Sequence, residues 1–395
     1  MVVALTRSNG LISGATLRSG AAFYGTVRLK PPLRRYRPLT LFPCDPVLAA
    51  VRSLAADWDR ANGPETFPKD RVAALHAAGA TAAFVEMEGR VDALVDVLRA
   101  VGGADLSLGR VYEGHVNAVQ LVAAYGDASQ RATLDADVAA GCVYGVWNTE
   151  PMPGLALEDE GGQQFLQGAK SFATGAGYLD RILVTARDAD GAKQLVLVDI
   201  AGLGERADNR AWQVRGMRGT QSGTFDFSGM PIGAAETIGA PGDYEREPRF
   251  SAGAWRFTAV QLGAVEALVR HLRDHLVQTG KGADPIQRAR FGACVAATRS
   301  AGLWVRQAAH RAQDQAEGAI PLVLMTRGIV EEAGLAVMEA AARSVGTASF
   351  FAGSRIDRIT RDLGLYLRQP VPDQARDRAA GAWLDADCWG EDRWW

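Results

Sequence analysis

The segment from residue 141 to residue 190 constrains the fold of this chain more than any other. In it, apolar residues alternate with small or polar residues over short runs that glycine and proline interrupt, a pattern typical of antiparallel strands. Two short motifs, NTE at 148–150 and KSF at 170–172, lie where such strands are expected to end. Because loops at strand ends often carry ligand-binding groups, both motifs predict a site for a planar ligand.

The sequence on either side of this segment has apolar residues at three- and four-residue spacing, which predicts helices. Further strands are expected at 181–186, 194–200, 212–214 and 224–227. Helices are expected at 46–62, 68–79, 91–102, 106–125, 127–140, 255–279, 285–315, 322–345, 354–367 and 372–385. We therefore expect an α+β fold with a leader at 1–41, a helical domain at 42–140, a β domain at 141–240 and a second helical domain at 241–395.

The composition excludes several classes of function. With 395 residues, a net charge of −2 and 22% charged residues, the whole chain suggests neither a nucleic-acid partner nor a membrane surface. Its four cysteines lie far apart without a C-x-x-C pair, which argues against a zinc site and for a reducing, cytoplasmic location. His271 and His275 have i, i+4 spacing, but no third ligand accompanies them, so no metal site is expected.

The first forty residues carry seven basic residues and no acidic residue, and they are rich in serine, threonine and glycine. Such a composition is also found in organellar transit peptides. We favour the simpler interpretation, a poorly packed leader or an upstream start codon. Whether residues 1–41 belong to the mature protein is left open by the sequence.

From about residue 42 to residue 385, the chain resembles the acyl-CoA dehydrogenase superfamily. Residues 149–151 (TEP) are similar to the TEP of its TEP…GSD run, and residues 168–174 (GAKSFAT) to its G-x-K-x-W-I-T run. The helical stretches FPKDRVAALHAAG and VNAVQLVAAYGDASQRATLDADVAAG resemble its amino-terminal domain. The resemblance implies an N-terminal helical domain, a middle antiparallel β-barrel-like domain and a C-terminal four-helix bundle.

The resemblance also implies FAD as the cofactor. In the superfamily the TEP segment lies along the isoalloxazine ring, and an aromatic residue of the second run stacks on that ring. The arginine of an R-x-x-F-G run and the turn of a Q-x-x-G-G run bind the dinucleotide part of the FAD held by a neighbouring subunit. The matching positions here are Trp147, Asn148, Thr149, Phe172, Thr174, Arg288, Phe291, Gly346 and Thr347. A homodimer or homotetramer is therefore expected. The serine and aspartate of GSD are replaced by Leu155 and Ala156, and the glutamine of Q-x-x-G-G by Arg343.

The catalytic base of the superfamily is missing. Counted from the Arg361-Asp362 pair, the usual glutamate falls at Pro370, and the alternative position falls near Trp255. Neither residue can accept a proton. By motif, the nearest carboxylates are Glu113 and Asp373, which are the weak candidates for a base; His115, on the same helix as Glu113, reads as an interior histidine.

The function expected first is therefore an FAD-dependent oxidoreductase acting on CH–CH donors, which dehydrogenates an acyl thioester and passes electrons to an electron-transfer flavoprotein. An alternative is a flavin-dependent monooxygenase on the same fold, which needs no α-proton base and is served by a flavin reductase. A degenerate, non-catalytic flavin- or acyl-binding protein is the third possibility. The substrate is expected to be an acyl-CoA or another apolar small molecule.

Overall fold

The computed structural model describes residues 45–61 and 65–386. The predicted leader at 1–41 lies outside the described residues. Five helices come first along the described chain, close to the predicted ranges. They are α1 (Pro46–Ala61), α2 (Lys69–Ala77), α3 (Val91–Ala104), α4 (Leu106–Tyr125) and α5 (Ala128–Ala140). Side-chain caps set two of these starts, because the Asp105 carboxylate accepts a bond from the Leu108 amide at 3.1 Å and Asp127 forms a reciprocal capping box with Gln130.

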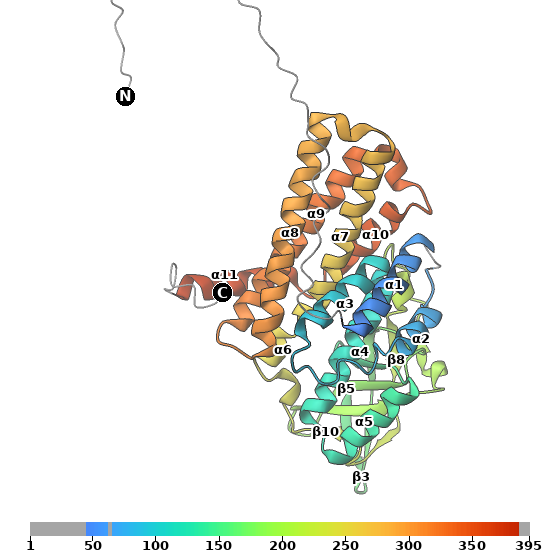
Figure 1. Cartoon of the computed structure of the whole chain (residues 1–395). Helices are drawn as coiled ribbons and strands as arrows, with labels where there is room; N and C mark the ends of the chain where they lie inside the picture. Colours follow the sequence, from blue (N-terminus) through green and yellow to red (C-terminus); the bar gives the residue numbers. More distant parts are fainter. Residues whose placement is uncertain (1–44, 62–64, 387–395) are drawn as a thin grey trace, which may run out of the picture. The chain divides into compact units, whose positions relative to one another are not determined.

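Strands follow, as the alternating pattern predicts. They are β1 (Tyr144–Trp147), β2 (Ala156–Glu160), β3 (Gln163–Gln167), β4 (Ala169–Ala173), β5 (Arg181–Arg187), β6 (Lys193–Asp199), β7 (Ala207–Asp208), β8 (Gly223–Asp226), β9 (Met230–Ile232) and β10 (Thr237–Ile238). A seven-stranded sheet has the order β10-β6-β5-β2-β3-β9, with β1 added beside β5, and a three-stranded sheet has the order β4-β8-β7. Figure 1 shows these strands in green in the lower part of the view, together with α4 and α5.

Two details of the β region differ from the expectation. The sheet is mixed, because β1 pairs with β5 in parallel while most other pairs are antiparallel. Residues 212–214 form no strand. Their backbone turns instead, with the Trp212 amide donating to the Asn209 carbonyl at 3.0 Å and the indole N–H donating to the Met217 carbonyl at 3.1 Å. The local bond of the Trp212 amide uses a backbone donor that a strand would have paired with a neighbouring strand.

The C-terminal region is helical. Its helices are α6 (Arg249–Ala252), α7 (Trp255–Gln278), α8 (Pro285–Gln313), α9 (Ala319–Val345), α10 (Arg355–Tyr366) and α11 (Pro372–Asp385). Three of them, α7, α8 and α9, have 24 to 29 residues. In Figure 1, α7, α8, α9 and α10 run side by side in yellow to red, and α11 lies along the end of α9. The predicted bundle is thus confirmed, whereas the domain boundaries stay a prediction.

Helix α3 packs directly on α7, which joins the two helical regions. Glycines make this approach possible: a Cβ on Gly102 would lie 2.2 Å from the Val260 carbonyl oxygen, and a Cβ on Gly263 would lie 2.0 Å from that of Arg99. Any larger residue at either position would push the helices apart.

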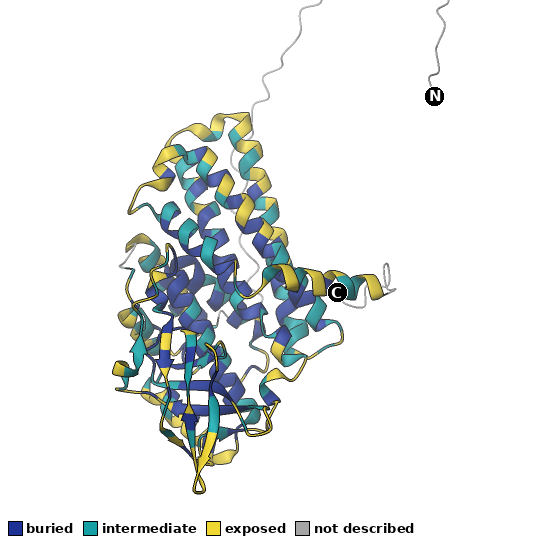
Figure 2. Ribbon diagram, turned by 180° about the vertical axis from the view of Figure 1, so that it is seen from behind, coloured by how far each residue is buried: buried dark blue, intermediate teal, exposed yellow. Residues whose placement is uncertain are grey.

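Helix α4 lies between the helical regions and the sheet, and it contributes to three apolar clusters. Leu108 and Tyr112 belong to the cluster of α3, α7 and α9, Val111 to the interior of the sheets, and Val119 and Val122 to the cluster between α5, β1 and β6. Figure 2 shows this middle layer almost entirely in the colour of buried residues. A polar side chain on α4 is therefore placed in an interior from which water is largely excluded. None of the helices in the described residues has both the length and the hydropathy needed to cross a membrane.

Candidate functional site

The loop after β1 is held to the sheet by a buried lysine. Lys170 of β4 is fully buried, and its ammonium donates to the Glu150 carboxylate at 2.6 Å, to the Asn148 carbonyl at 3.2 Å and to the Thr185 hydroxyl at 3.2 Å. Thr185 in turn donates to the side-chain oxygen of Asn148 at 2.8 Å. Burial lowers the pKa of Lys170, and its bond to Glu150 partly offsets that effect. The motifs NTE and KSF, which the sequence singled out separately, are thus one buried polar unit.

Around this unit, the predicted cofactor residues differ in accessibility. Trp147 is buried, packs against Phe225 and Phe227, and donates its indole N–H to the Thr174 carbonyl at 3.0 Å. Thr149 is exposed, and its carbonyl accepts a bond from the Ser171 amide at 2.9 Å. The Trp147 indole is therefore engaged inside the sheets, whereas the Thr149 side chain is accessible.

Phe172 stands at a bulge between β4 and β8. Its φ of 51° is left-handed, a conformation rarely adopted by a bulky residue, and its ring is 61% exposed. The ring meets the edge of Trp212, with centroids 6.4 Å apart and an interplanar angle of 87°. Strained backbone that displays an aromatic ring to solvent is found mainly at functional sites. Nothing at sequence level indicated that Trp212 would lie beside Phe172.

A chain of hydroxyl groups continues from Phe172 into the protein. Thr174 lies 3.2 Å from the Ser222 hydroxyl, Ser222 donates to Thr220 at 2.8 Å, and Thr220 donates to the Met217 carbonyl at 2.8 Å. Met217 precedes the turn η2 (Arg218–Thr220), Thr220 is its last residue, and Ser222 follows it. The chain fixes the position of the Thr174 hydroxyl relative to the loop 217–222.

A small cavity of about 10 Å³, which has room for about one water molecule, lies between α4, β1 and the segment that follows Thr174. Its lining residues are Arg110, Val111, Gly114, Gly145, Val146, Trp147, Thr174 and Leu179. A Cβ built on Gly114 would meet nothing within 4 Å, so the helix leaves open space there. The cavity is far smaller than pockets that enclose a drug-sized ligand, which measure roughly 300–1,000 Å³, so a flavin ring would have to bind outside it.

Behind the cavity wall, α4 places an ion pair in the interior. Arg110 donates to the Glu113 carboxylate, and the Tyr366 hydroxyl donates to the same carboxylate oxygen at 3.4 Å. Tyr366 is buried at the end of α10, and its pKa is raised well above the usual value by burial and by the charge of Glu113. Arg110 lines the cavity and Glu113 does not. The carboxylate of Glu113, the candidate base, is therefore engaged by Arg110 and Tyr366.

A second buried arginine feels the charge of Glu113. Arg256, at the start of α7, is 7% exposed and donates to the side-chain oxygen of Gln120 and, at 3.3 Å, to the Gly253 carbonyl. Burial lowers its pKa to about 10, with the charge of Glu113 partly offsetting the effect. The superfamily position near Trp255 that can supply a base is here next to a buried cation.

The other candidates are distant from this interior or fully engaged. Asp373 is exposed in the first turn of α11. His115 is buried, accepts a bond from the Tyr144 amide at 3.0 Å through Nδ1 and lies 2.8 Å from the Thr81 carbonyl through Nε2, as expected for a neutral interior histidine. Burial lowers its pKa to about 4. Neither residue borders the cavity.

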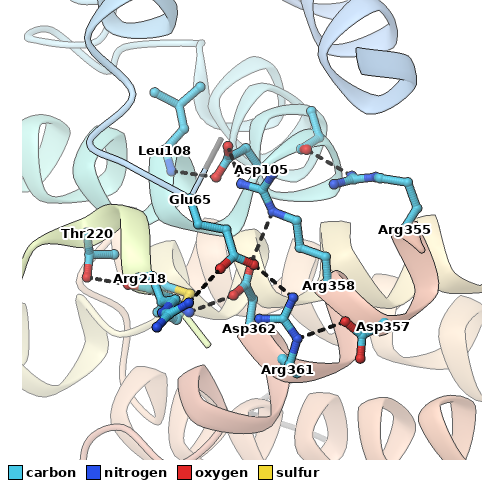
Figure 3. Close-up of polar contacts among 12 residues, drawn as sticks. Glu65, Asp105, Leu108, Arg218, Thr220, Arg355, Asp357, Arg358, Arg361 and Asp362 are labelled. Atoms are coloured by element: carbon cyan, nitrogen blue, oxygen red, sulfur yellow. Dashed lines mark hydrogen bonds and ion pairs between the residues drawn. The ribbon is translucent and has the colours of Figure 1, made fainter. Parts of the chain in front are cut away.

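An ionic network ties α10 to the start of α4 and to the loop 217–222 (Figure 3). Arg358 lies 3.3 Å from the Asp105 carboxylate, and Asp362 accepts a bond from the Met217 amide at 2.6 Å. Glu65 bridges Arg361 at 2.8 Å and Arg218 at 3.4 Å. Burial raises the pKa of Asp362 to about 6, although the Met217 bond opposes the shift.

The residues matched to the dinucleotide positions lie apart from the cavity, on α8 and after α9. Arg288 is exposed and donates to the carbonyls of Gly282, at 3.4 Å, and Ala283 in the turn η4 (Lys281–Ala283). Phe291 is half-buried against the helical core. Gly346, with a φ of 76°, and the exposed Thr347 begin η5 (Gly346–Phe350). Their roles stay predictions, because in the superfamily they act across subunits.

Three residues of the interior cluster, Arg110, Tyr366 and Arg256, were not predicted as functional. One signal was present: Arg110 and Glu113 carry the only formal charges in the otherwise apolar or neutral helix 106–125. Such a pair in a buried helix indicates an interior polar site. Arg256 and Tyr366 could not be found in the same way, because they lie about 140 and 250 residues after Glu113 along the chain.

No protein-family model matches the sequence. Over 236 residues the chain is 28% identical to a dibenzothiophene monooxygenase of Rhodococcus erythropolis, a match that covers 54% of this chain and 56% of that protein. The chain thus spans about half the length of the curated relatives that it matches.

Solved structures show the fold. The dibenzothiophene monooxygenase TdsC of Paenibacillus sp. A11-2, in complex with FMN and indole, superposes with a TM-score of 0.76 at 19% identity over 86% of this chain and 97% of that chain. The butyryl-CoA dehydrogenase of Megasphaera elsdenii superposes with a TM-score of 0.73 at 16% identity over 87% and 99%. The chain has the acyl-CoA dehydrogenase-like fold, as expected.

Proposed function

We propose that this chain is a flavin-dependent monooxygenase built on the acyl-CoA dehydrogenase-like fold. The observation that carries the proposal is the position of Glu113. An α-proton base must come within hydrogen-bond reach of its substrate. Glu113 instead accepts hydrogen bonds from Arg110 and Tyr366, and it is not among the residues that line the cavity. No carboxylate is among the residues that line the cavity in the described chain. This arrangement favours a monooxygenase, the alternative function expected from the sequence, over an acyl-thioester dehydrogenase.

Two exposed residues at the ends of β1 and β4 fit a flavin ring. Thr149 offers a hydroxyl, and the exposed ring of Phe172 offers a stacking surface. When bound and reduced, a flavin supplies the electrons that activate molecular oxygen. The protein contributes orientation, because the buried Lys170 fixes the loop that carries Thr149 and lies two residues from Phe172.

The identity of the flavin belongs to the same proposal. FAD is the form that Arg288, Phe291, Gly346 and Thr347 would suit, since these residues match positions that serve a dinucleotide in a neighbouring subunit. FMN is the form bound by TdsC. Retention of FAD implies a homodimer or homotetramer, and use of oxygen implies a flavin reductase rather than an electron-transfer flavoprotein as the electron source.

The proposal is tested by oxygen labelling. The purified protein is supplied with FMN or FAD, NADH, a separate flavin reductase and ¹⁸O₂, with indole as the probe because TdsC binds it. We expect a product that contains one ¹⁸O atom, formed in amounts above a reaction without the protein. Phe172→Ala should lower the yield, whereas the change of an exposed valine on α7, Val277→Ala, should not.

Two other results would replace the proposal. Rapid bleaching of the flavin by an acyl-CoA thioester without oxygen, and no labelled product, would identify a dehydrogenase. Tight flavin binding with neither reaction would identify a non-catalytic binding protein.

A further inference from the structure

Met217 is held on both sides within the loop between β7 and β8. Its φ of 58° is left-handed, which is rare for a side chain of this size, and its side chain is buried. Its amide donates to the Asp362 carboxylate at 2.6 Å. Its carbonyl accepts bonds from the Trp212 indole at 3.1 Å and from the Thr220 hydroxyl at 2.8 Å. Strained backbone persists only where its surroundings determine it, so these bonds fix the loop at Met217.

The two residues bonded to the Met217 carbonyl reach the end of β4. The edge of the Trp212 ring meets the ring of Phe172, with centroids 6.4 Å apart. The Thr220 carbonyl accepts a bond from the Gly175 amide at 2.8 Å. The segment 172–175, which carries the exposed ring, is therefore contacted at both ends by residues that Met217 holds.

Helix α10 supports the other side of Met217. Asp362, which binds the Met217 amide, is only 5% exposed. The Arg361 guanidinium donates to the Arg215 carbonyl at 2.7 Å, and a Cβ on Gly216 would lie 2.0 Å from the Arg361 carbonyl oxygen. The backbone of the loop thus lies directly on α10. Because α10 packs on α4 and α7, it is a rigid support for the loop.

We propose that Asp362 is a positioning residue, which holds the Phe172 ring in place by fixing Met217. Asp362 is buried whereas the Phe172 ring is 61% exposed, so the carboxylate acts through the loop. This inference rests on the proposed function for the flavin that the ring would face, but the positioning itself requires no flavin. Loss of the acceptor at position 362 should loosen the segment 172–175 even in the flavin-free protein.

Hydrogen–deuterium exchange of the flavin-free protein tests the positioning. Asp362→Leu removes the acceptor of the Met217 amide, whereas Asp362→Asn keeps an oxygen there. Relative to a peptide from β5, the peptide that contains Gly175 should exchange roughly tenfold faster in Asp362→Leu, because one hydrogen bond that resists opening is lost. In Asp362→Asn it should stay within about twofold of the wild type. Leu272→Ala, a change of a buried leucine on α7, lowers the stability generally and should leave the ratio unchanged.

Binding of FMN tests the consequence for a ligand, and a second variant serves if Asp362→Leu does not fold. Trp212→Phe keeps an aromatic ring beside Phe172 but removes the indole N–H that donates to Met217. FMN affinity should fall roughly threefold to tenfold in Asp362→Leu and in Trp212→Phe, as expected when one aromatic stacking contact is lost. The double variant should lose little more than either single variant, because both changes act through Met217.

Unchanged exchange of the Gly175 peptide in Asp362→Leu would overturn the inference, as would an Asp362→Asn variant that exchanges like Asp362→Leu. Additive losses of FMN affinity in the double variant, or full affinity in Trp212→Phe, would also overturn it. Faster exchange in Asp362→Leu, in a protein that binds no FMN or forms no ¹⁸O-labelled product, would uphold the positioning and refute the proposed function.

Discussion

Replacing Lys170 by methionine tests whether the buried ion pair under the β1 loop stabilises both the fold and the site. Lys170 has no exposed surface, and its ammonium contacts Glu150, the Asn148 carbonyl and the Thr185 hydroxyl. Methionine keeps the unbranched shape of the chain but removes the charge and three donors. The Glu150 carboxylate, 17% exposed, would keep only Arg187, 3.3 Å away, as its ion-pair partner.

The expected cost follows from this geometry. Removing one partner of a buried ion pair typically costs about 3–5 kcal/mol, because the other charge is left uncompensated. The remaining contact of Glu150 with Arg187 places our expectation near the lower value, about 3 kcal/mol. This is a large part of the total stability of an ordinary domain, roughly 5–15 kcal/mol.

The assay is urea unfolding followed by tryptophan fluorescence, with the midpoint and the slope recorded for each variant. Lys193→Met is the matched control. Lys193 on β6 forms an ion pair of the same length, 2.6 Å, with Glu245, but both side chains are partly exposed, so its loss should cost less than about 1 kcal/mol. Lys170→Met combined with Glu150→Leu should cost less than the sum of the single changes.

The reasoning would be refuted if Lys170→Met and Lys193→Met lost the same free energy of unfolding, or if the double variant were simply additive. Flavin affinity adds a functional readout. Because Lys170 holds the Asn148 carbonyl, flavin binding should weaken in Lys170→Met and stay unchanged in Lys193→Met.

Three further predictions concern other parts of the structure. The pKa of Asp362 is raised from 3.8 to about 6, so the stability that its protonation contributes is complete below pH 4 and is lost as the pH rises through 6. Between pH 4 and pH 7 the free energy of unfolding of Asp362→Asn should therefore rise by about 3 kcal/mol relative to that of the wild type. Parallel pH profiles of the two proteins in urea unfolding would contradict this. Arg288→Ala should weaken FAD binding about tenfold to a hundredfold and leave FMN binding unchanged; equal FAD affinity in calorimetry would remove Arg288 from the site. Gly114→Ala should raise the free energy of unfolding by about 0.5–1 kcal/mol, since the added Cβ meets open space in a helix. Gly114→Leu should instead fill the cavity and weaken flavin binding. Tight flavin binding by the leucine variant would show that the cavity is not part of the site.

Local sequence signals predicted most of the elements. The helix at 106–125 was placed at its observed bounds, because Asp105 caps its start and a glycine follows its end. The helix at 372–385 was equally well placed, with proline in its first turn. These features depend on neighbours within a few residues, which the sequence displays directly.

Features that depend on distant residues could not be predicted in the same way. The parallel pairing of β1 with β5 joins segments about 40 residues apart. The bond between Arg256 and Gln120 forms only when α7 packs on α4. The edge contact of Trp212 with Phe172 needs a turn that looks like a short strand in the sequence. The motif around Lys170 was visible, but its ion pair with Glu150 appears only when β4 lies beside the β1 loop.

The central claim is that the interior carboxylate, Glu113, is committed to Arg110 and Tyr366 and cannot serve as an α-proton base. Anaerobic mixing of the flavin-loaded protein with octanoyl-CoA, followed by absorbance in a stopped-flow instrument, tests it most directly. We predict little or slow bleaching of the flavin, with no more than a small further loss in Glu113→Gln or in Asp373→Asn. Fast bleaching that either substitution abolishes would contradict the claim and identify an ordinary dehydrogenase.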